Sequence, residues 1–376
     1  MKLKQCEFCV MDTSDPQITF DGDGICNHCI DAREAIASLG TFEDKKARLK
    51  HKIKEIKKRN ANNEYDVIMG VSGGVDSSYA LVKANELGLR ILAVHCDTGW
   101  NSDIAVSNIK SLVEILNIDL ETIVVNWPIM RSIQRSFFLA SVSNCDIPQD
   151  HAIVAVNNEL ASRLGVRDFI SGGNLAGESI MPSSWGYDAR DLTHIKDINK
   201  KFDDVSLRKF PKMSFFSSYF YFPFIKGIRN YRLLNDLDYN PLEAKNELIE
   251  NYGWKDYGGK HHESVFTRFY QAHYLPQKFN FDKRKGHLSS LIAAGLITRD
   301  DALVELKKEI YKHEDKKRDE VYFINKLGFT EAEWDSIMKA APVSHYDYKT
   351  HSYLHSKMTK LKKAIESRGI KVRRSW

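Results

Sequence analysis

Long apolar runs are missing from this sequence of 376 residues. No stretch approaches the roughly 18 uncharged residues that a membrane-spanning helix needs. The N-terminal residues contain charges and cysteines where a secretory signal would have an apolar core. We therefore expect a cytoplasmic protein.

The sequence also has little excess charge of either sign. Its 55 basic and 50 acidic residues give a formal net charge of only +5, which provides little counterion-release affinity for a nucleic acid. Positive charge is concentrated in residues 356–376, where we favour a solvated helix over a contact with a polyanion. Nucleic acid is therefore not an expected partner, and neither is a membrane.

Cysteine is scarce, and four of the six cysteines form two C-x-x-C pairs. Cys6 and Cys9 make the first pair, and Cys26 and Cys29 make the second, at a spacing typical of a four-cysteine zinc ribbon. Four thiolates close a tetrahedral site and leave no open position for substrate, so we expect a structural zinc ion. Two disulfides are the alternative, which fits poorly with a chain without an export signal.

From residue 65 onward, the sequence alternates between predicted strands and predicted helices. The strand patterns occupy residues 65–71, 90–97, 120–126 and 167–173. The helical patterns occupy residues 76–88, 102–118, 128–142 and 151–164. Such alternation is typical of an α/β fold with a parallel sheet and helices on both faces, in which ligands bind at the carboxyl ends of the strands.

Four regions follow from these patterns. The first is the zinc ribbon at 1–35, and the second is a charged, proline-free helical linker at 36–64. The α/β domain is expected at 65–205. We expect the remainder, 206–376, to be mainly helical and to bind substrate and a partner protein.

The first predicted strand ends at Ser72-Gly73-Gly74, and a helix follows at once. Free backbone amides and the positive end of that helix would face an anion, and the glycines would let a phosphate approach the backbone. No lysine follows the second glycine, which excludes the G-x-x-x-x-G-K-[ST] loop, and the G-x-G-x-x-G fingerprint is also absent. A capped turn is the alternative, but we favour a phosphate-binding loop.

The motif S-G-G-V-D-S-S at 72–78 resembles the S-G-G-x-D-S loop of the PP-loop ATP pyrophosphatases, which include asparagine synthetase, NAD synthetase and tRNA thiolases. The resemblance implies an adenine nucleotide alpha hydrolase-like domain that cleaves ATP between its α and β phosphates. A substrate oxygen would take the AMP group, and a nitrogen or sulfur nucleophile would then displace AMP. The implied cofactors are ATP and Mg²⁺.

The same resemblance implies which residues bind the nucleotide. Phosphate would be held by Val71, Ser72, Gly73, Gly74, Asp76, Ser77 and Ser78. Adenine would lie near the end of the second strand, at His95 and Asp97. After the fourth strand, Gly173 and Asn174 would contact the nucleotide, Glu178 would help to hold phosphate and metal, and Asp76 would bring the Mg²⁺.

Several blocks are similar to a narrower family, the N-acetyl sugar amidotransferases of O-antigen and flagellin sugar biosynthesis. They are the N-terminal CEFCVMDTSDP motif and residues 96–109, 146–153, 222–235 and 252–303. The resemblance implies that an acetamido group on a bacterial sugar is converted into an acetamidino group with ATP and ammonia. It leaves open which sugar this is and whether a nucleotide carries it.

The ammonia must come from solution or from another chain. Cys6 is preceded by other residues and no G-x-C-x-G elbow occurs, so the sequence has no pattern of a glutaminase nucleophile. The family resemblance implies a partner in two parts, a glutaminase and a barrel synthase like those of the histidine pathway.

A dense group of charges in 258–269 is a candidate catalytic block. Lys260, His261, His262, Glu263 and Arg268 would suit an anionic, adenylated intermediate, although a solvated loop is the alternative. Either histidine or Glu263 would serve as base toward ammonia, and the sequence does not decide among them.

A second basic group follows the catalytic block. It consists of Lys283, Arg284 and Lys285, which would meet an anionic group of the substrate or face water.

An ATP-dependent tRNA-modifying enzyme of the thiolase type is the runner-up. It shares the zinc ribbon and the adenylating loop, but such enzymes commonly need further cysteines near the site. Cys96 and Cys145 are unpaired in sequence, and a buried apolar role is the default for each. A third alternative is a zinc-binding adaptor protein without enzymatic activity. Such a protein would not need a complete phosphate-binding loop, so we do not favour it.

Overall fold

The computed structural model describes residues 3–258, 264–311 and 313–367. Its centre is a parallel sheet of five strands in the order β3-β2-β1-β4-β5. The strands are β1 (Val67–Gly70), β2 (Ile91–Asp97), β3 (Asp119–Val124), β4 (Asp168–Ser171) and β5 (Arg229–Arg232). The predicted α/β fold with a parallel sheet is therefore confirmed.

The first four strands and the helices that connect them lie close to their predicted positions. The helices are α3 (Val75–Glu86), α4 (Asp103–Leu116), α5 (Trp127–Leu139) and α6 (Ile147–Leu164). The sequence did not predict β5, which pairs with β4 from Asp168↔Arg229 to Ser171↔Arg232. Because β5 comes after residue 205, the sheet extends past the predicted end of the α/β domain.

Helices cover both faces of the sheet because alternate strand residues point to opposite sides. Val67 and Met69 of β1 belong to one apolar cluster, together with side chains from α3, α4 and α2 (Phe42–Arg59). Ile68, between them, belongs to a second cluster with Val156 of α6. This arrangement leaves the carboxyl edge of the strands as the open edge, at which α3 and α6 begin.

The predicted linker region contains α2, which is fixed to the sheet. Thr41 and Asp44 form a capping box at the start of the helix. At its end, Arg59 makes a two-pronged ion pair with Asp168 of β4, with nitrogen–oxygen distances of 3.0 and 2.7 Å. This part of the chain is thus a structural element of the α/β domain.

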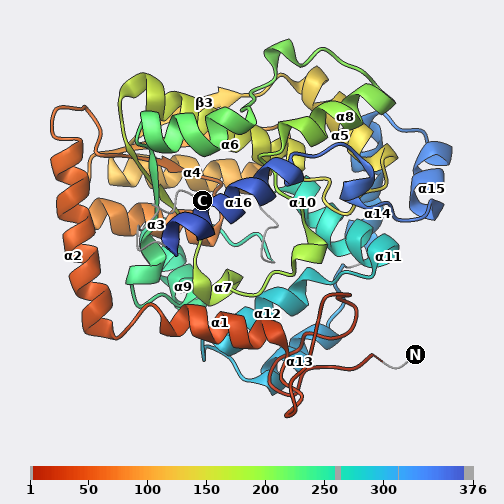
Figure 1. The fold of residues 1–376 in the computed structure, drawn as a ribbon, viewed down its shortest axis with the longest axis horizontal. Helices are drawn as coiled ribbons and strands as arrows, with labels where there is room; N and C mark the ends of the chain where they lie inside the picture. The colour runs from red at the N-terminus through yellow and green to blue at the C-terminus, as the bar shows by residue number, and fades with distance from the viewer. Residues whose placement is uncertain (1–2, 259–263, 312, 368–376) are drawn as a thin grey trace.

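The remainder of the chain is mainly helical (Figure 1). The helices are α7 (Leu175–Glu178), α8 (Leu192–Phe202), α9 (Pro241–Tyr252), α10 (Val265–Phe269), α11 (Leu275–Phe279), α12 (Lys283–Ala293), α13 (Arg299–Lys307), α14 (His313–Leu327), α15 (Glu331–Lys339) and α16 (Ser352–Glu366). Two π-helical segments are η3 (Ser217–Ile225) and η5 (Tyr270–Tyr274). Within the described ranges, we find no helix with the length and apolarity needed to cross a bilayer.

An aromatic core joins the C-terminal helices to α5. The ring of Phe138 lies edge-on to Phe266, Tyr274, Phe323 and Trp334, with centroid distances between 4.9 and 5.9 Å. Edge-to-face contacts of this kind add to the stabilisation from apolar burial. The helical region is therefore fixed against the α/β domain.

The N-terminal segment is a small ribbon followed by α1 (Asn27–Ala37). Two isolated antiparallel bridges, Gln5↔Asp12 and Phe20↔Cys26, hold its turns. In Figure 1 this segment lies beside α12 and α13.

Candidate active site

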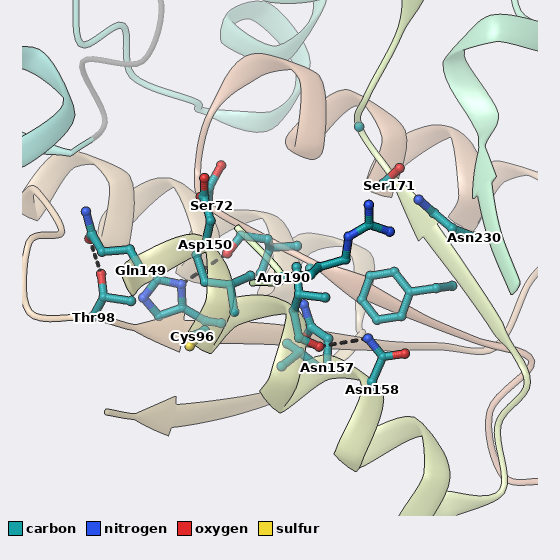
Figure 2. Close-up of a pocket in the computed structure, with 18 of the residues that line it drawn as sticks. Ser72, Cys96, Thr98, Gln149, Asp150, Asn157, Asn158, Ser171, Arg190 and Asn230 are labelled. Atoms are coloured by element: carbon teal, nitrogen blue, oxygen red, sulfur yellow. Dashed lines mark hydrogen bonds between the residues drawn. The ribbon is translucent and has the colours of Figure 1, made fainter. Parts of the chain in front are cut away.

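A cavity of about 1350 Å³ opens at the carboxyl ends of the strands. Its walls include residues from four strand ends: Val71 and Ser72 after β1, His95 of β2, Ser171 of β4 and Arg232 of β5. The start of α6 and residues of η3, α10, η5 and α12 complete it. Figure 2 shows that its labelled lining is largely polar, and this edge is where ligands bind in open parallel sheets.

The phosphate-binding loop lies at one wall of this cavity. Gly73 has a φ angle of +80°, and a Cβ atom there would lie 2.5 Å from the carbonyl oxygen of Ala105 in α4. Glycine is therefore required on both conformational and steric grounds. The Gly73 carbonyl oxygen accepts hydrogen bonds from the indole of Trp254 at 3.1 Å and the amide of Asn108 at 3.5 Å.

Serine side chains tighten the same loop. The hydroxyl groups of Ser72 and Ser77 are 3.1 Å apart, and the Gly74 amide donates to the Ser72 hydroxyl at 3.3 Å. The Ser77 hydroxyl also bonds to the Gly74 carbonyl oxygen, and Ser78 is buried in the first turn of α3. Gly74 is the N-cap of α3 and has no side chain that could cap the helix, and the Val75 amide donates to the Tyr257 hydroxyl. The positive end of this helix is thus available to an anion.

The second glycine-rich break packs directly on the first. A Cβ atom at Gly172 would lie 2.7 Å from the carbonyl carbon of Asp76 and from the Ser77 nitrogen. At the next position, a Cβ atom on Gly173 would lie 3.8 Å from the Glu178 carboxylate. The loop after β4 and the loop after β1 therefore approach each other through backbone.

Asn174 has a structural part in this loop. It is buried, its Oδ1 accepts from the Gly177 amide at 2.7 Å, and its Nδ2 donates to the Gly172 carbonyl oxygen at 3.1 Å. These bonds cap α7 and fix the turn. Its amide group is therefore engaged with backbone, and the predicted contact with the nucleotide stays a prediction.

Asp76 and Glu178 lie beside Tyr239. The Tyr239 hydroxyl donates a hydrogen bond to Asp76 Oδ1. Burial and the two nearby carboxylates raise the pKa of Tyr239 well above its usual range, so its hydroxyl remains a donor. Two carboxylates together with water and substrate phosphates are a typical ligand set for Mg²⁺. The predicted metal-holding role of Asp76 fits this placement.

His95 and Asp97 hold the ends of β1 and β2. His95 Nδ1 donates to the Val71 carbonyl oxygen at 3.1 Å, and its Nε2 accepts from Asn101 at 2.9 Å. This pattern requires the neutral imidazole. Asp97 accepts from Asn101 and from the Gly99 amide. His95 lines the cavity, and Asp97 is the last residue of β2.

The structure separates the predicted substrate residues from one another. Lys283 lines the cavity. Arg268 instead pairs with the buried Asp319 of α14, and Arg284 pairs with Asp282 at 2.8 Å. Both arginines have carboxylate partners outside the cavity.

Lys260, His261, His262 and Glu263 lie outside the described residues. On one side of them, the Tyr257 hydroxyl accepts a hydrogen bond from the Val75 amide of the phosphate-binding loop at 3.2 Å. On the other side, Ser264 lines the cavity and pairs with Asn101. The chain therefore enters and leaves this block at the site.

Several lining residues escaped the sequence analysis. They are Thr98, Asp146, Gln149, Asp150, Asn157, Asn158, Arg190, Asn230, Arg232 and Gln271. The spacing of Asp146 and Asp150, one turn apart at the start of α6, was an available signal because it places both carboxylates on one helix face. Arg190 lies in a segment without a recognisable motif, whereas Asn230 and Arg232 lie within the 222–235 block that carries the family resemblance.

The four paired cysteines form a compact centre away from the cavity. Their sulfur atoms are buried and lie within 4.8 Å of one another. Backbone amides of Met11 and Cys26 point to the sulfurs of Cys9 and Cys6 at 3.4 and 3.2 Å. This donor set fits a tetrahedral zinc ion. His28 lies between Cys26 and Cys29 in sequence, but its ring is hydrogen-bonded to Asp15 at 2.6 Å and is not one of the four grouped ligands.

The ribbon is anchored to the C-terminal helices. Arg299 of α13 donates to the carbonyl oxygens of Cys6 and Cys9, each at 3.1 Å. Lys285 of α12 pairs with Asp12 at 2.6 Å, so this predicted substrate cation has a structural partner. Lys283, two residues earlier, remains at the cavity.

Residues 263–362 match the family model described as "LPS biosynthesis protein WbpG-like, C-terminal domain". This part of the chain is therefore similar to the WbpG-like C-terminal domain, and we call it the WbpG-like domain. The resemblance predicted for this part of the sequence is confirmed. The WbpG-like domain includes α10 to α15 and contributes Ser264, Thr267, Gln271 and Lys283 to the cavity.

Three solved structures illustrate what the chain resembles. NMN synthetase from Francisella tularensis is 21% identical, with a TM-score of 0.27, over 36% of this chain. The chain spans 56% of the length of that protein. An NH3-dependent NAD synthetase from Campylobacter jejuni is 15% identical, with a TM-score of 0.28, over 56% of this chain and 94% of that chain.

The third is the U34-tRNA thiolase NcsA from Methanococcus maripaludis, solved with its [4Fe-4S] cluster. It is 13% identical, with a TM-score of 0.31, over 82% of this chain and 90% of that chain. No curated protein matches the chain.

Proposed function

We propose that this chain is an ATP-dependent, AMP-forming amidotransferase that converts an acetamido group of a bacterial surface-polysaccharide or flagellin-glycan sugar into an acetamidino group. One observation carries the proposal: the cavity lies between the phosphate-binding loop and the WbpG-like domain, and both contribute to its walls. The prediction of an ATP-using enzyme of ligase type is supported by the same pair of features.

The size of the cavity suits two substrates. Sites for single small molecules usually have volumes of about 300 to 1000 Å³, and this cavity is larger, at about 1350 Å³. A nucleotide on the loop side would leave room for a sugar against the start of α6 and the WbpG-like domain. Polar lining residues such as Gln149, Asn157 and Gln271 would bind sugar hydroxyl groups.

The loop residues would perform the first step by positioning and electrostatics. The amide oxygen of an acetamido group is a weak nucleophile, so it must be held in line with the α-phosphorus of ATP. The amides at the start of α3 would stabilise the charge on the departing pyrophosphate. A Mg²⁺ ion, held by Asp76 and Glu178, would neutralise phosphate charge in the same step.

The second step needs ammonia, and we propose a partner protein as its source. This partner would have a glutaminase part and a barrel-synthase part, like the pair of the histidine pathway. The proposal is supported by the arrangement of the cysteines: four belong to the ribbon centre, and Cys145 is buried. Cys96 follows His95 in β2 and has no glutaminase sequence around it.

The cysteines also argue against the thiolase alternative. Sulfur relay through protein thiols, or a cluster at the site, needs more than one cysteine there. Of the six cysteines, only Cys96 lines the cavity, and burial raises the pKa of its thiol to about 12. A thiol in this environment is a poor nucleophile.

The test is AMP and pyrophosphate release from ATP with ammonium present, across a panel of diacetamido sugars and bulk tRNA. The sugars carry heavy oxygen in the acetyl carbonyl. We expect AMP only with a sugar, and we expect the heavy oxygen to appear in AMP because the carbonyl oxygen becomes a phosphate oxygen. AMP formation with tRNA alone would support the thiolase alternative instead.

A further inference from the structure

A carboxylate and an ammonium group face the cavity beyond the phosphate-binding loop. Asp150 lies in the first turn of α6, whose N-cap is Asp146. Lys283 is the first residue of α12, in the WbpG-like domain. All three line the cavity (Figure 2 labels Asp150). The group joins the α/β domain to the WbpG-like domain at the place where we expect the sugar.

The two aspartates differ in their partners. Gln149 donates to Asp146 Oδ1 at 2.7 Å and accepts from the Thr98 hydroxyl at 2.6 Å, so Asp146 is fixed in a chain of hydrogen bonds. Asp150 has no side-chain hydrogen bond or ion pair to any described residue. Its side chain is exposed to the cavity. It is thus an available acceptor at the site.

Lys283 also lacks a partner for its charge among the described residues. Its ammonium nitrogen lies over the ring of Tyr270, 5.8 Å from the centroid. An ammonium group that is half-buried without a carboxylate at ion-pair distance is costly unless a ligand or a nearby charge compensates it. Asp146 and Asp150 are the charges that offset it at longer range.

Burial and neighbouring charges shift the pKa values of Asp150 and Lys283. Loss of hydration against the surrounding protein and the charge of the Asp146 carboxylate raise the pKa of Asp150, and the Lys283 ammonium group lowers it; the opening of the side chain to the cavity limits the effect of desolvation. Burial lowers the pKa of Lys283. Among the described residues, the charges of Asp146 on α6 and Lys283 on α12 act on Asp150, and Asp150 acts on Tyr270 of η5. Arg190, which also lines the cavity, is paired with Asp188. A base with a pKa near the working pH is well matched to proton transfer.

We propose that Asp150 is the base that accepts the proton of the attacking nitrogen, and that Lys283 is a positioning residue whose positive charge favours the ionised form of Asp150. The inference rests on the amidotransferase function proposed above. Ammonia attacks the amide carbon of the adenylated substrate and forms the C–N bond. The C–O bond to the phosphate breaks, and its electron pair leaves with AMP. One proton passes from the nitrogen to the Asp150 carboxylate and from there to solvent.

Two partial reactions separate this role from the adenylation step. Sugar-dependent exchange of pyrophosphate into ATP reports adenylation, and amidine formation reports the ammonia step. We expect Asp150→Asn to retain the exchange and to lose amidine formation by roughly 100-fold or more. The matched control is Glu159→Gln, which removes an exposed carboxylate from the same helix and should leave both rates unchanged.

The pH profile tests Lys283. At a fixed concentration of free ammonia, amidine formation by the wild type should rise with pH as Asp150 ionises. Lys283→Met should move the midpoint upward because a compensating positive charge is lost, and Lys283→Arg should restore it. A purely structural Lys283 would change the rate but leave the midpoint in place, which would overturn its proposed role.

The possible failures are distinguishable. Unchanged amidine formation by Asp150→Asn, with intact exchange, would overturn the role of Asp150 alone. Loss of exchange in that variant would show that Asp150 acts in adenylation instead. If the wild type shows no pyrophosphate exchange into ATP with any acetamido sugar, both the proposed function and this inference are overturned. A carboxyl signal of Asp150 that titrates at ordinary acidic pH in the folded protein would also overturn it.

Discussion

The indole nitrogen of Trp254 donates a hydrogen bond to the carbonyl oxygen of Gly73 at 3.1 Å, although the two residues are 181 positions apart. The Val75 amide in turn donates to the hydroxyl of Tyr257. The segment after α9 therefore holds the phosphate-binding loop from outside the sheet. Two aromatic residues that are distant in sequence thus help to shape the loop at 72–78.

Trp254→Phe should weaken the loop without removing the buried ring. The variant loses one hydrogen bond, and we expect a decrease of about 1 kcal/mol in the free energy of unfolding. ATP affinity, measured by calorimetry, should fall more clearly than stability because the Gly73 carbonyl loses its main donor. Unchanged ATP affinity would show that the loop keeps its shape without this contact.

Gly73→Ala should abolish nucleotide binding. The added Cβ atom would meet the Ala105 carbonyl oxygen at 2.5 Å, at a φ angle of +80°. We expect a loss of about 1 to 3 kcal/mol in folding stability, measured by denaturant unfolding, and no detectable ATP binding. Gly22→Ala is the control because no atom lies within 4 Å of its Cβ position. Equal ATP affinity in the two variants would contradict the proposed close packing.

Asp76→Asn should abolish catalysis and leave the folding stability nearly unchanged. The asparagine retains an oxygen that accepts from Tyr239, so the melting temperature should change little. Pyrophosphate release should fall to background because the amide is a poor magnesium ligand. Tyr239→Phe, which removes only the donor, is the comparison. Substantial turnover by Asp76→Asn would rule out the metal-holding role.

Cys9→Ser should release zinc and lower stability. Removing one of four thiolates opens the site, and the ribbon is too small to remain folded without the ion. Because Arg299 bonds to the backbone of Cys6 and Cys9, the docking on α13 should loosen as well. Metal analysis and thermal unfolding measure both effects. Cys96→Ser, which changes a thiol outside the centre, should keep its zinc content.

A buried histidine pair predicts loss of stability in acid. His194 Nε2 and His345 Nδ1 are 2.9 Å apart. Burial lowers the pKa of His194 to about 4 and that of His345 to about 3. Both are therefore neutral when folded but titrate near pH 6.5 when unfolded. Their contribution to stability is present above that pH and is lost as the pH falls toward 4.

Denaturant unfolding at pH 7 and pH 5 measures this loss. We expect it to be on the order of 2 kcal/mol for the wild type. His345→Gln, which cannot titrate, should lose less between these two pH values. An equal loss in the variant would assign the acid sensitivity to other groups.

The amino-acid sequence by itself determined the features that depend on residues close to one another in the chain. The loop at 72–78 has its shape because adjacent glycines end an apolar strand, and the C-x-x-C pairs specify a four-thiolate centre by spacing alone. β1 and β2 were predictable because their apolar residues are buried between two helical layers. β3 is mostly exposed, and its β-branched residues made it predictable. The sequence also predicted the family of the C-terminal part, which the family match confirms.

Tertiary structure alone decided the remainder. The four residues of β5, Arg-Asn-Tyr-Arg, are mostly exposed and polar, so no hydrophobic pattern marks them, and only pairing with β4 makes them a strand. Lys283 and Arg284 are neighbours in sequence, yet one faces the cavity and the other pairs with Asp282. Charge and spacing cannot separate them, because the direction of a side chain is set by the packing of its helix against distant parts of the chain.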